Sequence, residues 1–245
     1  MVSLAKAETY QQSHVSAGRP DSELVRVAEL FESKTPQDVL RWALNEFDDR
    51  IAIATGFGPE GIVLLDMAVR IKPTVKVFFL DTGLLFPETY ELRERVEQKY
   101  QLKVIEHKSS LSVSAQATQY GDELWKRNPD LCCKLRKLDP LKEALKELDA
   151  WITGIRREQS ISRKNAAIVE RDQRWNLIKV NPLARWTKND VWKYILKNQL
   201  PYNPLHDAGY SSIGCTHCTR AVQEGEDERA GRWSGFAKTE CGLHG

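Results

Sequence analysis

The stretch that decides the fold reads IAIATGFGPEG and occupies residues 51–61. Its first four residues are apolar and predict a short buried strand at 51–54. A glycine-bearing turn follows, and after it Ile62 and Leu65 begin a helical pattern. Such a turn can present backbone N–H groups to a phosphate at a helix N-terminus. It can equally bind nothing, because it lacks the Gly-Lys-Ser/Thr ending of a nucleotide-hydrolase loop and the spacing of a dinucleotide fingerprint.

Strands and helices alternate on both sides of this stretch. Before it, residues 21–49 predict two helices, the first capped by Asp21 and the second restarted at Thr35-Pro36. Strand, helix, strand, helix, strand is the pattern of a parallel sheet flanked by helices, so the expected fold class is α/β. Such folds bind ligands in the loops at the carboxyl ends of their strands. The other expected elements are a strand at 75–80, a helix at 87–100, a strand at 102–105, mostly helix over 112–148, a strand at 150–153, a hairpin-like stretch up to 180 and a helix at 187–197.

Composition excludes several classes of protein. The chain has 245 residues with 36 Lys+Arg and 34 Asp+Glu, and a net charge of +2 does not support nucleic-acid binding. The length suits one α/β domain with an appendage. No apolar run approaches the roughly 20 residues that a membrane span requires. Residues 1–20 read as a polar N-terminal tail without a signal core, so we expect a cytoplasmic protein.

Two further strand ends carry candidate ligand-binding residues. Asp81, Thr82 and Gly83 follow the second strand, where they can hold a nucleotide's sugar or base, or form a turn or cap. Arg156 and Arg157 follow the fourth strand. Paired guanidinium groups suit a phosphate or sulfate dianion, although the pair can also be a solvated surface feature partnered by the neighbouring glutamate.

The chain has five cysteines, at 132, 133, 215, 218 and 241. An odd number without a signal peptide argues against a disulfide framework. Cys132-Cys133 and Cys215-x-x-Cys218 together offer four thiolates for zinc or an iron–sulfur cluster. An adjacent pair does not fit the two C-x2–4-C arms of a structural zinc site, which favours a [4Fe–4S] cluster. Zinc, or cysteines buried in the core, remain the alternatives.

The fifth cysteine lies near the chain end. Glycines and charges dominate residues 219–245, and we expect a mobile C-terminal tail with Cys241 exposed in it. His244 and Lys238 could lower the pKa of this thiol. That setting is typical of a nucleophile that a closing segment carries to a bound substrate. An incidental surface thiol is the alternative.

Together these motifs resemble the assimilatory sulfonucleotide reductases, the adenylylsulfate and phosphoadenylylsulfate reductases. The resemblance covers about Ile51 to His244, most of the chain. It implies an adenine-nucleotide α-hydrolase-like fold in which Ala54–Gly61 takes the place of the modified pyrophosphate loop, with Gly61 where the family often has Asp. It rests on LDTG (80–83), FPET (86–89), TGIRREQS (153–160), VNPL (180–183), PYNPLH (201–206) and ECGLH (240–244).

The four paired cysteines resemble the adenylylsulfate reductase branch, which holds one [4Fe–4S] cluster. The resemblance implies that adenosine 5′-phosphosulfate is reduced to sulfite and AMP in cysteine biosynthesis. Cys241 would form an S-sulfocysteine that reduced thioredoxin or a glutaredoxin-like protein resolves. The implied catalytic residues are Cys241, His244 and Lys137. The implied substrate-binding residues are Thr55, Gly56, Phe57, Gly58, Asp81, Thr82, Gly83, Arg156, Arg157, Arg229 and Arg232, and the cluster ligands are Cys132, Cys133, Cys215 and Cys218.

This interpretation divides the chain into a polar tail at 1–20, a sulfonucleotide-binding domain with the iron–sulfur site at 21–218 and a mobile catalytic tail at 219–245. It predicts a small-molecule substrate and a protein reductant, no membrane or nucleic acid, and it allows a homo-oligomer. Two rivals stay open. One is reduction of the 3′-phosphorylated substrate, alone or in addition. The other is a non-catalytic iron–sulfur redox sensor.

Overall fold

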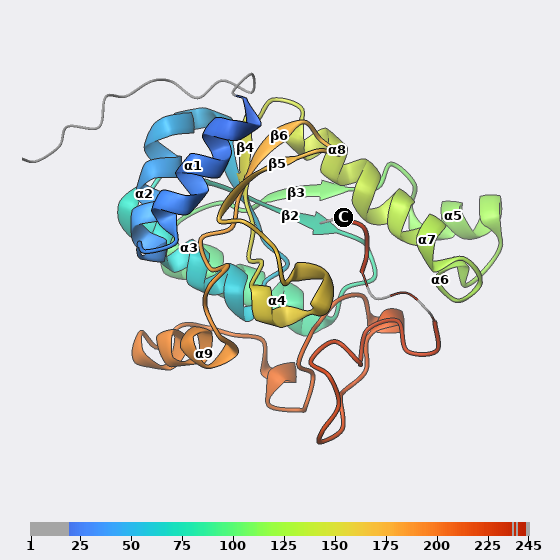
Figure 1. Ribbon diagram of the computed structural model, residues 1–245. Helices are drawn as coiled ribbons and strands as arrows, with labels where there is room; N and C mark the ends of the chain where they lie inside the picture. The colour runs from blue at the N-terminus through green and yellow to red at the C-terminus, as the bar shows by residue number, and fades with distance from the viewer. Residues whose placement is uncertain (1–19, 237, 239, 244–245) are drawn as a thin grey trace, which may run out of the picture.

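The computed structural model describes residues 20–236, 238 and 240–243. In this part of the chain a six-stranded sheet lies between two layers of helices, with the strand order β3-β2-β1-β4-β6-β5 (Figure 1). The strands are β1 (Ile51–Ala54), β2 (Lys76–Asp81), β3 (Ile105–Lys108), β4 (Ala150–Ile152), β5 (Val169–Asp172) and β6 (Leu177–Val180). The helices are α1 (Asp21–Phe31), α2 (Pro36–Phe47), α3 (Pro59–Ile71), α4 (Pro87–Tyr100), α5 (Val113–Tyr120), α6 (Leu124–Arg127), α7 (Pro129–Cys133), α8 (Asp139–Leu145) and α9 (Lys188–Lys197), with a π-helical turn at Lys134–Leu138.

The predicted α/β class is confirmed. Every pairing between neighbouring strands is parallel except that of β5 with β6, which form the expected antiparallel hairpin. The chain winds outward from β1 to β2 and β3, and then returns to place β4 on the other side of β1. The order of the strands therefore reverses between β1 and β4. Parallel sheets bind ligands beyond the carboxyl ends of the strands at such a switch point.

Successive side chains of β1 point to opposite faces of the sheet, and apolar residues are buried on both faces. Ile51 and Ile53 point into the larger core, which α2, α3 and α9 help to form. Ala52 belongs to a smaller core on the opposite face, where it packs with Trp151 and with Leu141 of α8. Burying each Leu or Ile side chain stabilises the fold by about 1.5–3 kcal/mol. A strand with two buried faces reads as a continuous apolar run, which is the pattern of residues 51–54.

Local capping sets several helix starts. Thr35 accepts a hydrogen bond from the backbone N–H of Asp38, whose carboxylate bonds back to Thr35, so the predicted start at Pro36 is confirmed. The prediction that Asp21 caps α1 is wrong. Helix α1 begins at Asp21 itself, after Pro20, without a side-chain cap. The carboxylate of Asp21 instead accepts from Nε of Arg171 at 2.7 Å, which ties α1 to the edge strand β5.

The predicted third strand was misplaced by three residues. Leu102 and Val104 are apolar, but their backbone N–H groups bond to Glu97 of α4, so this segment completes the helix end. Pairing with β2 begins only at Ile105, opposite Phe78. The strand that forms, IEHK, is polar because it lies at the edge of the sheet. None of the helices in the described ranges is long and apolar enough to cross a bilayer.

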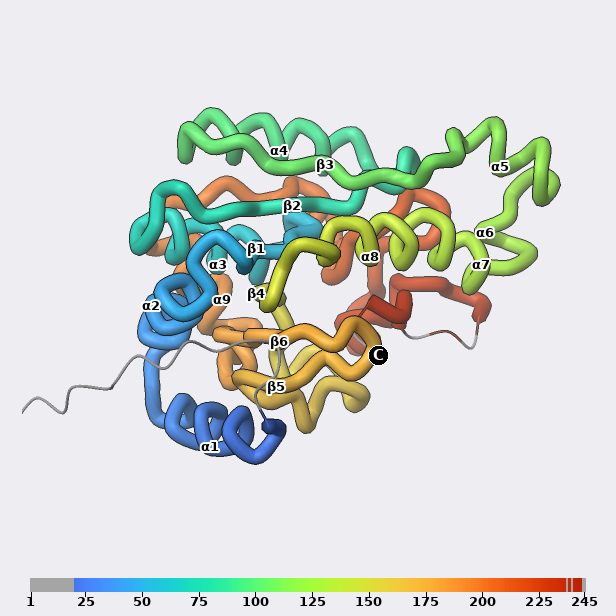
Figure 2. Tube along the Cα trace, turned by 90° about the horizontal axis from the view of Figure 1, so that it is seen from above, coloured from blue at the N-terminus to red at the C-terminus, as the bar shows by residue number. Residues whose placement is uncertain are grey.

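The C-terminal segment returns to the carboxyl ends of the strands. In Figure 1 its red ribbon lies on the side to which β2 and β3 point, and Figure 2 shows it on that same side, beside α7 and α8. Trp233 is 1% exposed, its backbone N–H bonds to the carbonyl of Cys218, and Thr219 pairs with Arg232. Trp233 is thus buried in the fold, whereas residues 223–227 of the same segment are exposed. The residues expected to form the N-terminal tail lie outside the described ranges, apart from Pro20.

Candidate functional site

The loop after β1 forms one wall of a cavity. Thr55 is buried, and its Oγ1 accepts the backbone N–H of Phe57 at 2.9 Å. Phe57 adopts a left-handed conformation, with φ 57°, which turns the chain into α3. A Cβ at position 61 would overlap Oγ1 of Thr55, so glycine there lets the helix approach the loop. No side chain caps the start of α3 at Gly58, which leaves its first N–H groups available to an anion.

The cavity has a volume of about 270 Å³ and lies at the reversal point of the sheet. The loop after β1 lines it on one side, and Thr153 and Gly154 after β4 line it on the other. The cavity brings together nine of the predicted site residues: Thr55, Gly56, Phe57, Gly58, Thr82, Lys137, Arg229, Arg232 and Cys241. Residues separated by as much as 186 positions (241 − 55) therefore line one cavity.

The loop after β2 contributes only part of what was expected. Asp81 accepts the backbone N–H of Gly83 at 2.8 Å and the hydroxyl of Tyr90 at 2.6 Å, so its carboxylate closes the turn. Gly83 has a φ of 66° and belongs to the same turn. Neither residue lines the cavity, whereas Thr82 does. The alternative interpretation of Asp81 as a turn residue matches this geometry.

Cations dominate one end of the cavity. Lys137, Arg163, Arg229 and Arg232 all line it. Burial and the nearby charge of Arg163 lower the pKa of Arg229. Burial acts to lower the pKa of Lys137, but electrostatic interaction with Cys215 and Cys241 outweighs that effect and raises it. This end of the cavity suits an anion with several negative oxygens.

Trp233 supports these cations. The guanidinium of Arg232 lies 4.5 Å from the centre of its ring, that of Arg229 5.9 Å and the ammonium of Lys137 5.8 Å. The ring's negative face attracts cations, so one buried indole holds three cavity cations near each other despite their repulsion. Trp233 also packs with Cys133 and Cys241.

Cys241 is buried, at 9% exposed, so the prediction of an exposed thiol is wrong. Packing with Trp233 and Cys133 covers it and places it on the cavity wall. A polar, glycine-flanked sequence does not reveal this contact, because the partners lie elsewhere in the chain. Lys238 pairs with Asp130. His244, the other residue expected to assist, lies outside the described residues.

Glu240, next to Cys241, is anchored. Its carboxylate accepts from Nε and Nη2 of Arg163, each at 2.9 Å, and from Nη2 of Arg229 at 3.0 Å. Ser162 adds a hydroxyl at 3.3 Å. Burial acts to raise the pKa of Glu240, but the bonds and charge of Arg163 outweigh it and hold the pKa below its usual value.

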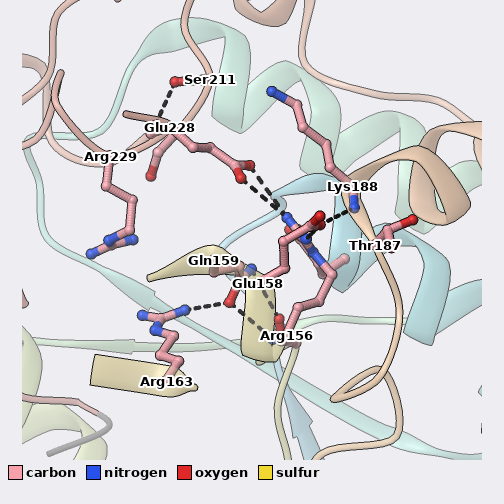
Figure 3. Close-up of polar contacts among 12 residues, drawn as sticks. Arg156, Glu158, Gln159, Arg163, Thr187, Lys188, Ser211, Glu228 and Arg229 are labelled. Atoms are coloured by element: carbon pink, nitrogen blue, oxygen red, sulfur yellow. Dashed lines mark hydrogen bonds and ion pairs between the residues drawn. The ribbon is translucent and has the colours of Figure 1, made fainter. Parts of the chain in front are cut away.

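Arg156 and Arg157 do not line the cavity. Arg156 is fully buried and bonds to Glu60 at 2.7 Å, Glu158 at 2.9 Å and Glu228 at 3.3 Å. Figure 3 shows its side chain with Glu158 and Glu228, and Glu158 also accepts the backbone N–H of Lys188. Arg157 points elsewhere, to Glu32 at 2.5 Å. The structure thus uses both guanidinium groups for internal ion pairs.

The four paired cysteines surround a second, smaller cavity. Cys132 and Cys133 at the end of α7 face Cys215 and Cys218, although 81 residues (134–214) separate the two pairs. All four are free thiols. Burial and the neighbouring thiolates raise the pKa of Cys132 to about 11. Lys137 lines both cavities and so stands between them.

An anionic metal cluster fits this donor set. Arg136 lines the cysteine cavity, is 3% exposed, and its Nε and Nη2 find no partner among the described residues. Unsatisfied donors on a buried guanidinium need hydrogen-bond acceptors, and an anionic cluster would supply them. In the same described ranges no three His, Cys, Asp or Glu side chains are grouped to hold a single metal ion. Four cysteine sulfurs around one cavity, with a buried cation beside them, suit a larger anionic group.

Sequence reasoning missed several cavity residues. Arg163 lines the cavity from the loop after β4, three residues beyond the TGIRREQS motif, and only its charge and its place after a strand could have marked it. Glu60, Glu228 and His206 also line the cavity. Nδ1 of His206 lies 2.7 Å from the carbonyl oxygen of Tyr210. Because a carbonyl oxygen only accepts hydrogen bonds, Nδ1 is the protonated ring nitrogen and donates.

Comparisons with known proteins agree with this geometry. A family model described as the phosphoadenosine phosphosulfate reductase domain matches residues 50–221. An adenosine 5′-phosphosulfate reductase of Halalkalibacterium halodurans is 51% identical over 221 residues, which cover 89% of this chain and 95% of the relative. One of Bacillus cereus is 48% identical over 238 residues and 97% of each chain. A crystal structure of phosphoadenylyl-sulfate reductase from Candida auris, a phosphate complex, has a TM-score of 0.75 and 35% identity, covering 85% of this chain and 100% of that one.

Proposed function

Because the chain belongs to the phosphoadenosine phosphosulfate reductase family, we propose that it reduces adenosine 5′-phosphosulfate to sulfite and AMP. The observation that carries the proposal is the position of Cys241, a free thiol on the wall of a cavity whose other walls offer a helix N-terminus and several cations. The curated relatives that share about half of its residues bear the name of this activity.

The two ends of the cavity divide the work of binding. The uncapped start of α3 and the backbone of Thr55–Gly58 would receive phosphate oxygens through N–H groups. Lys137, Arg229 and Arg232 would hold the sulfate and neutralise charge as an anionic thiolate approaches an anionic substrate. Arg156 would act indirectly, by fixing Glu60 beside the loop. His244 would assist Cys241, as the family resemblance implies.

The reaction consists of two successive displacements by thiols. The thiolate of Cys241 attacks the sulfur of the sulfate group, an S–S bond forms, and the S–O bond to AMP breaks. The product is S-sulfocysteine at Cys241. A thiol of reduced thioredoxin or a glutaredoxin-like protein then attacks Sγ of Cys241 and releases sulfite. Its second thiol resolves the mixed disulfide and leaves the partner oxidised. The partner's two electrons thus reduce sulfate to sulfite.

We assign the cysteine cavity to one [4Fe–4S] cluster with Cys132, Cys133, Cys215 and Cys218 as ligands. When bound, the cluster would supply structural and electrostatic support, with no electron-transfer step required of it. Arg136 offers unsatisfied donors to its anionic surface, and Lys137 connects its cavity to that of the substrate. Residues 21–218 would form the nucleotide-binding domain, and 219–245 the segment that carries the nucleophile. The reduced thiols that this chemistry needs are those of a cytoplasmic protein.

The rival substrate is 3′-phosphoadenosine 5′-phosphosulfate, because the solved relative from Candida auris is named for it. The test is sulfite release under anaerobic conditions with reduced thioredoxin, with each nucleotide supplied in turn. The proposal expects the unphosphorylated nucleotide to give the higher kcat/KM. A higher kcat/KM with the 3′-phosphorylated nucleotide would transfer the assignment to the rival. If neither nucleotide gives sulfite while the cluster is intact, the redox-sensor interpretation would be favoured.

A further inference from the structure

The carboxylate of Glu240 bonds to two cations that line the cavity, Arg163 and Arg229, although Glu240 itself is not a lining residue. Arg163 grips it with two parallel bonds of 2.9 Å, the fork-to-fork geometry of a strong Arg–carboxylate pair. Arg229 adds a third bond at 3.0 Å. The side chain of Arg163 is 11% exposed and that of Glu240 22%, so water competes weakly for these bonds.

Arg163 is itself fixed to the body of the domain. Its Nη1 donates to Oε1 of Gln159 at 2.6 Å, as Figure 3 shows. The same Gln159 oxygen accepts the backbone N–H of Arg156 at 3.0 Å, and its Nε2 donates to the carbonyl of Gly154 at 3.3 Å. A chain of hydrogen bonds therefore runs from the loop after β4, through Gln159 and Arg163, to the residue that precedes Cys241.

The chain on the other side of Cys241 is held too. The carbonyl of Gly242 accepts from Nη1 of Arg174, in the turn between β5 and β6. Gly242 has a φ of 80°, a conformation that glycine adopts without strain. Leu243 packs against the core on the α8 face of the sheet. The residues on both sides of Cys241 are therefore held by arginines: Glu240 through an ion pair and Gly242 through its backbone carbonyl.

We propose that Glu240 is a positioning residue that docks Cys241 in the cavity through Arg163. The inference rests on the proposed function, in which Cys241 is the nucleophile. Glu240 does not act on the substrate. Its bonds to Arg163 hold the segment around Cys241 in the arrangement in which the thiol of Cys241 faces the cavity. A thiol that is already in this position reacts faster than one that must first move back into the cavity. Arg229 bonds to Glu240 and also lines the anion end, so the anchor and the binding site share one cation.

The test measures how often Cys241 leaves its buried position. Iodoacetamide alkylation of Cys241 is followed by peptide mass in the wild type, in Glu240→Gln and in Glu224→Gln. Glu224 is an exposed carboxylate of the same segment and serves as the matched control. Losing the charged bonds of Glu240 should raise the alkylation rate about tenfold or more, while the control stays within about twofold of wild type. A Glu240→Gln rate within about twofold of wild type would overturn the proposal.

A second variant addresses the pair from its other side. Arg163→Gln should raise the alkylation rate in the same direction, and the double variant should add little beyond either single change, because both remove one interaction. Glu240→Asp keeps the charge and should restore part of the protection. Fully additive effects in the double variant would show that Glu240 does not act through Arg163 and would contradict the proposal.

Two readouts separate this inference from the proposed function. In Glu240→Gln, AMP should bind with unchanged affinity while the rate of sulfite formation falls, since the anion site remains and only the thiol is displaced. Weaker AMP binding in proportion to the lost rate would overturn the positioning role. If the wild type forms no S-sulfocysteine but Glu240→Gln still exposes Cys241, the proposed function fails and the anchor stands. If the wild type forms the adduct but alkylation is unchanged in the variant, only the anchor fails.

Discussion

Nε of Arg156 donates to the carboxylate of Glu60 over 2.7 Å, which joins the loop after β4 to the start of α3 across the reversal point of the sheet. Glu158 and Glu228 occupy the remaining guanidinium donors, at 2.9 and 3.3 Å. One fully buried cation therefore bonds to three carboxylates from three parts of the chain. Its function is to hold the cavity walls together, and the phosphate role that its sequence suggests has no support in its contacts.

Replacing Arg156 should destabilise the protein strongly. Arg156→Met removes the shared partner of Glu60 and Glu228, whose side chains are largely buried, and breaking a buried ion pair from one side costs about 3–5 kcal/mol. Arg157→Met is the matched control, because Arg157 is partly exposed and its pair with Glu32 contributes about 1 kcal/mol or less. Urea unfolding at neutral pH measures both. Equal losses of unfolding free energy in the two variants would contradict the assignment of Arg156 as the buried hub.

Glu228 should make stability depend on pH. Burial raises its pKa, although Arg156 opposes that effect. Between 4.5 and its raised pKa, this carboxyl is protonated in the folded protein but ionised in the unfolded chain. Ionising it in the folded protein costs stability, and this cost decreases as the pH falls from the folded-state pKa towards 4.5. Glu228→Gln mimics the protonated form. The variant should therefore gain more stability relative to wild type, measured as a larger free energy of unfolding, at about pH 7 than at about pH 5. Denaturant unfolding at both pH values checks this, and a difference that does not vary with pH would refute it.

Trp125 should protect the cysteine cavity. Its ring stacks on His217 with centroids 4.2 Å apart and planes 9° from parallel, and both residues line the cavity. Trp125→Ala should open this wall, so the visible absorbance of a [4Fe–4S] cluster should bleach faster in air. His217→Phe keeps an aromatic partner for the stack and should bleach at nearly the wild-type rate. Equal bleaching rates in wild type and Trp125→Ala would show that the stack does not shield the site.

Lys137 should be required for the rate of turnover but not for the assembly of the iron–sulfur cluster. It lines both cavities, and Cys215 and Cys241 both interact electrostatically with its ammonium group. Lys137→Ala should lower kcat/KM by roughly 10²–10³, the usual effect of removing one preorganised charge from a transition state. Iron content and visible absorbance should stay at wild-type values. Undiminished turnover with an intact cluster would contradict this role.

The sequence was sufficient for the elements whose pattern is local. The strand at 51–54, the helix start at Thr35-Pro36 and the start of α4 at Pro87 each depend on neighbouring residues, and all are confirmed. The edge strand β3 was misplaced because its residues are polar and its position is set by pairing with β2. Patterns of apolar residues carry no information on such pairing.

The site divides in the same way. Glycines, cysteines and strand ends marked the loop at 55–58, the cysteine cavity and Cys241, because these features appear as residue types at fixed spacing. The roles of the arginines were not visible. Arg156 and Arg163 occur in one short stretch, yet one becomes a buried hub and the other an anchor for Glu240. Partners at separations of 96 and 77 residues decide between these roles, and one-dimensional spacing does not contain them.

The central claim is that Cys241 accepts the sulfonate group of the substrate. The most direct measurement is the intact mass of the anaerobically purified protein after mixing with adenosine 5′-phosphosulfate in the absence of any reductant, with Cys241→Ser as the control. The account predicts a gain of one SO₃ group on Cys241, its discharge as sulfite by reduced thioredoxin, and no gain in the variant. An unchanged mass in the wild type with its cluster intact, or an equal gain in Cys241→Ser, would contradict it.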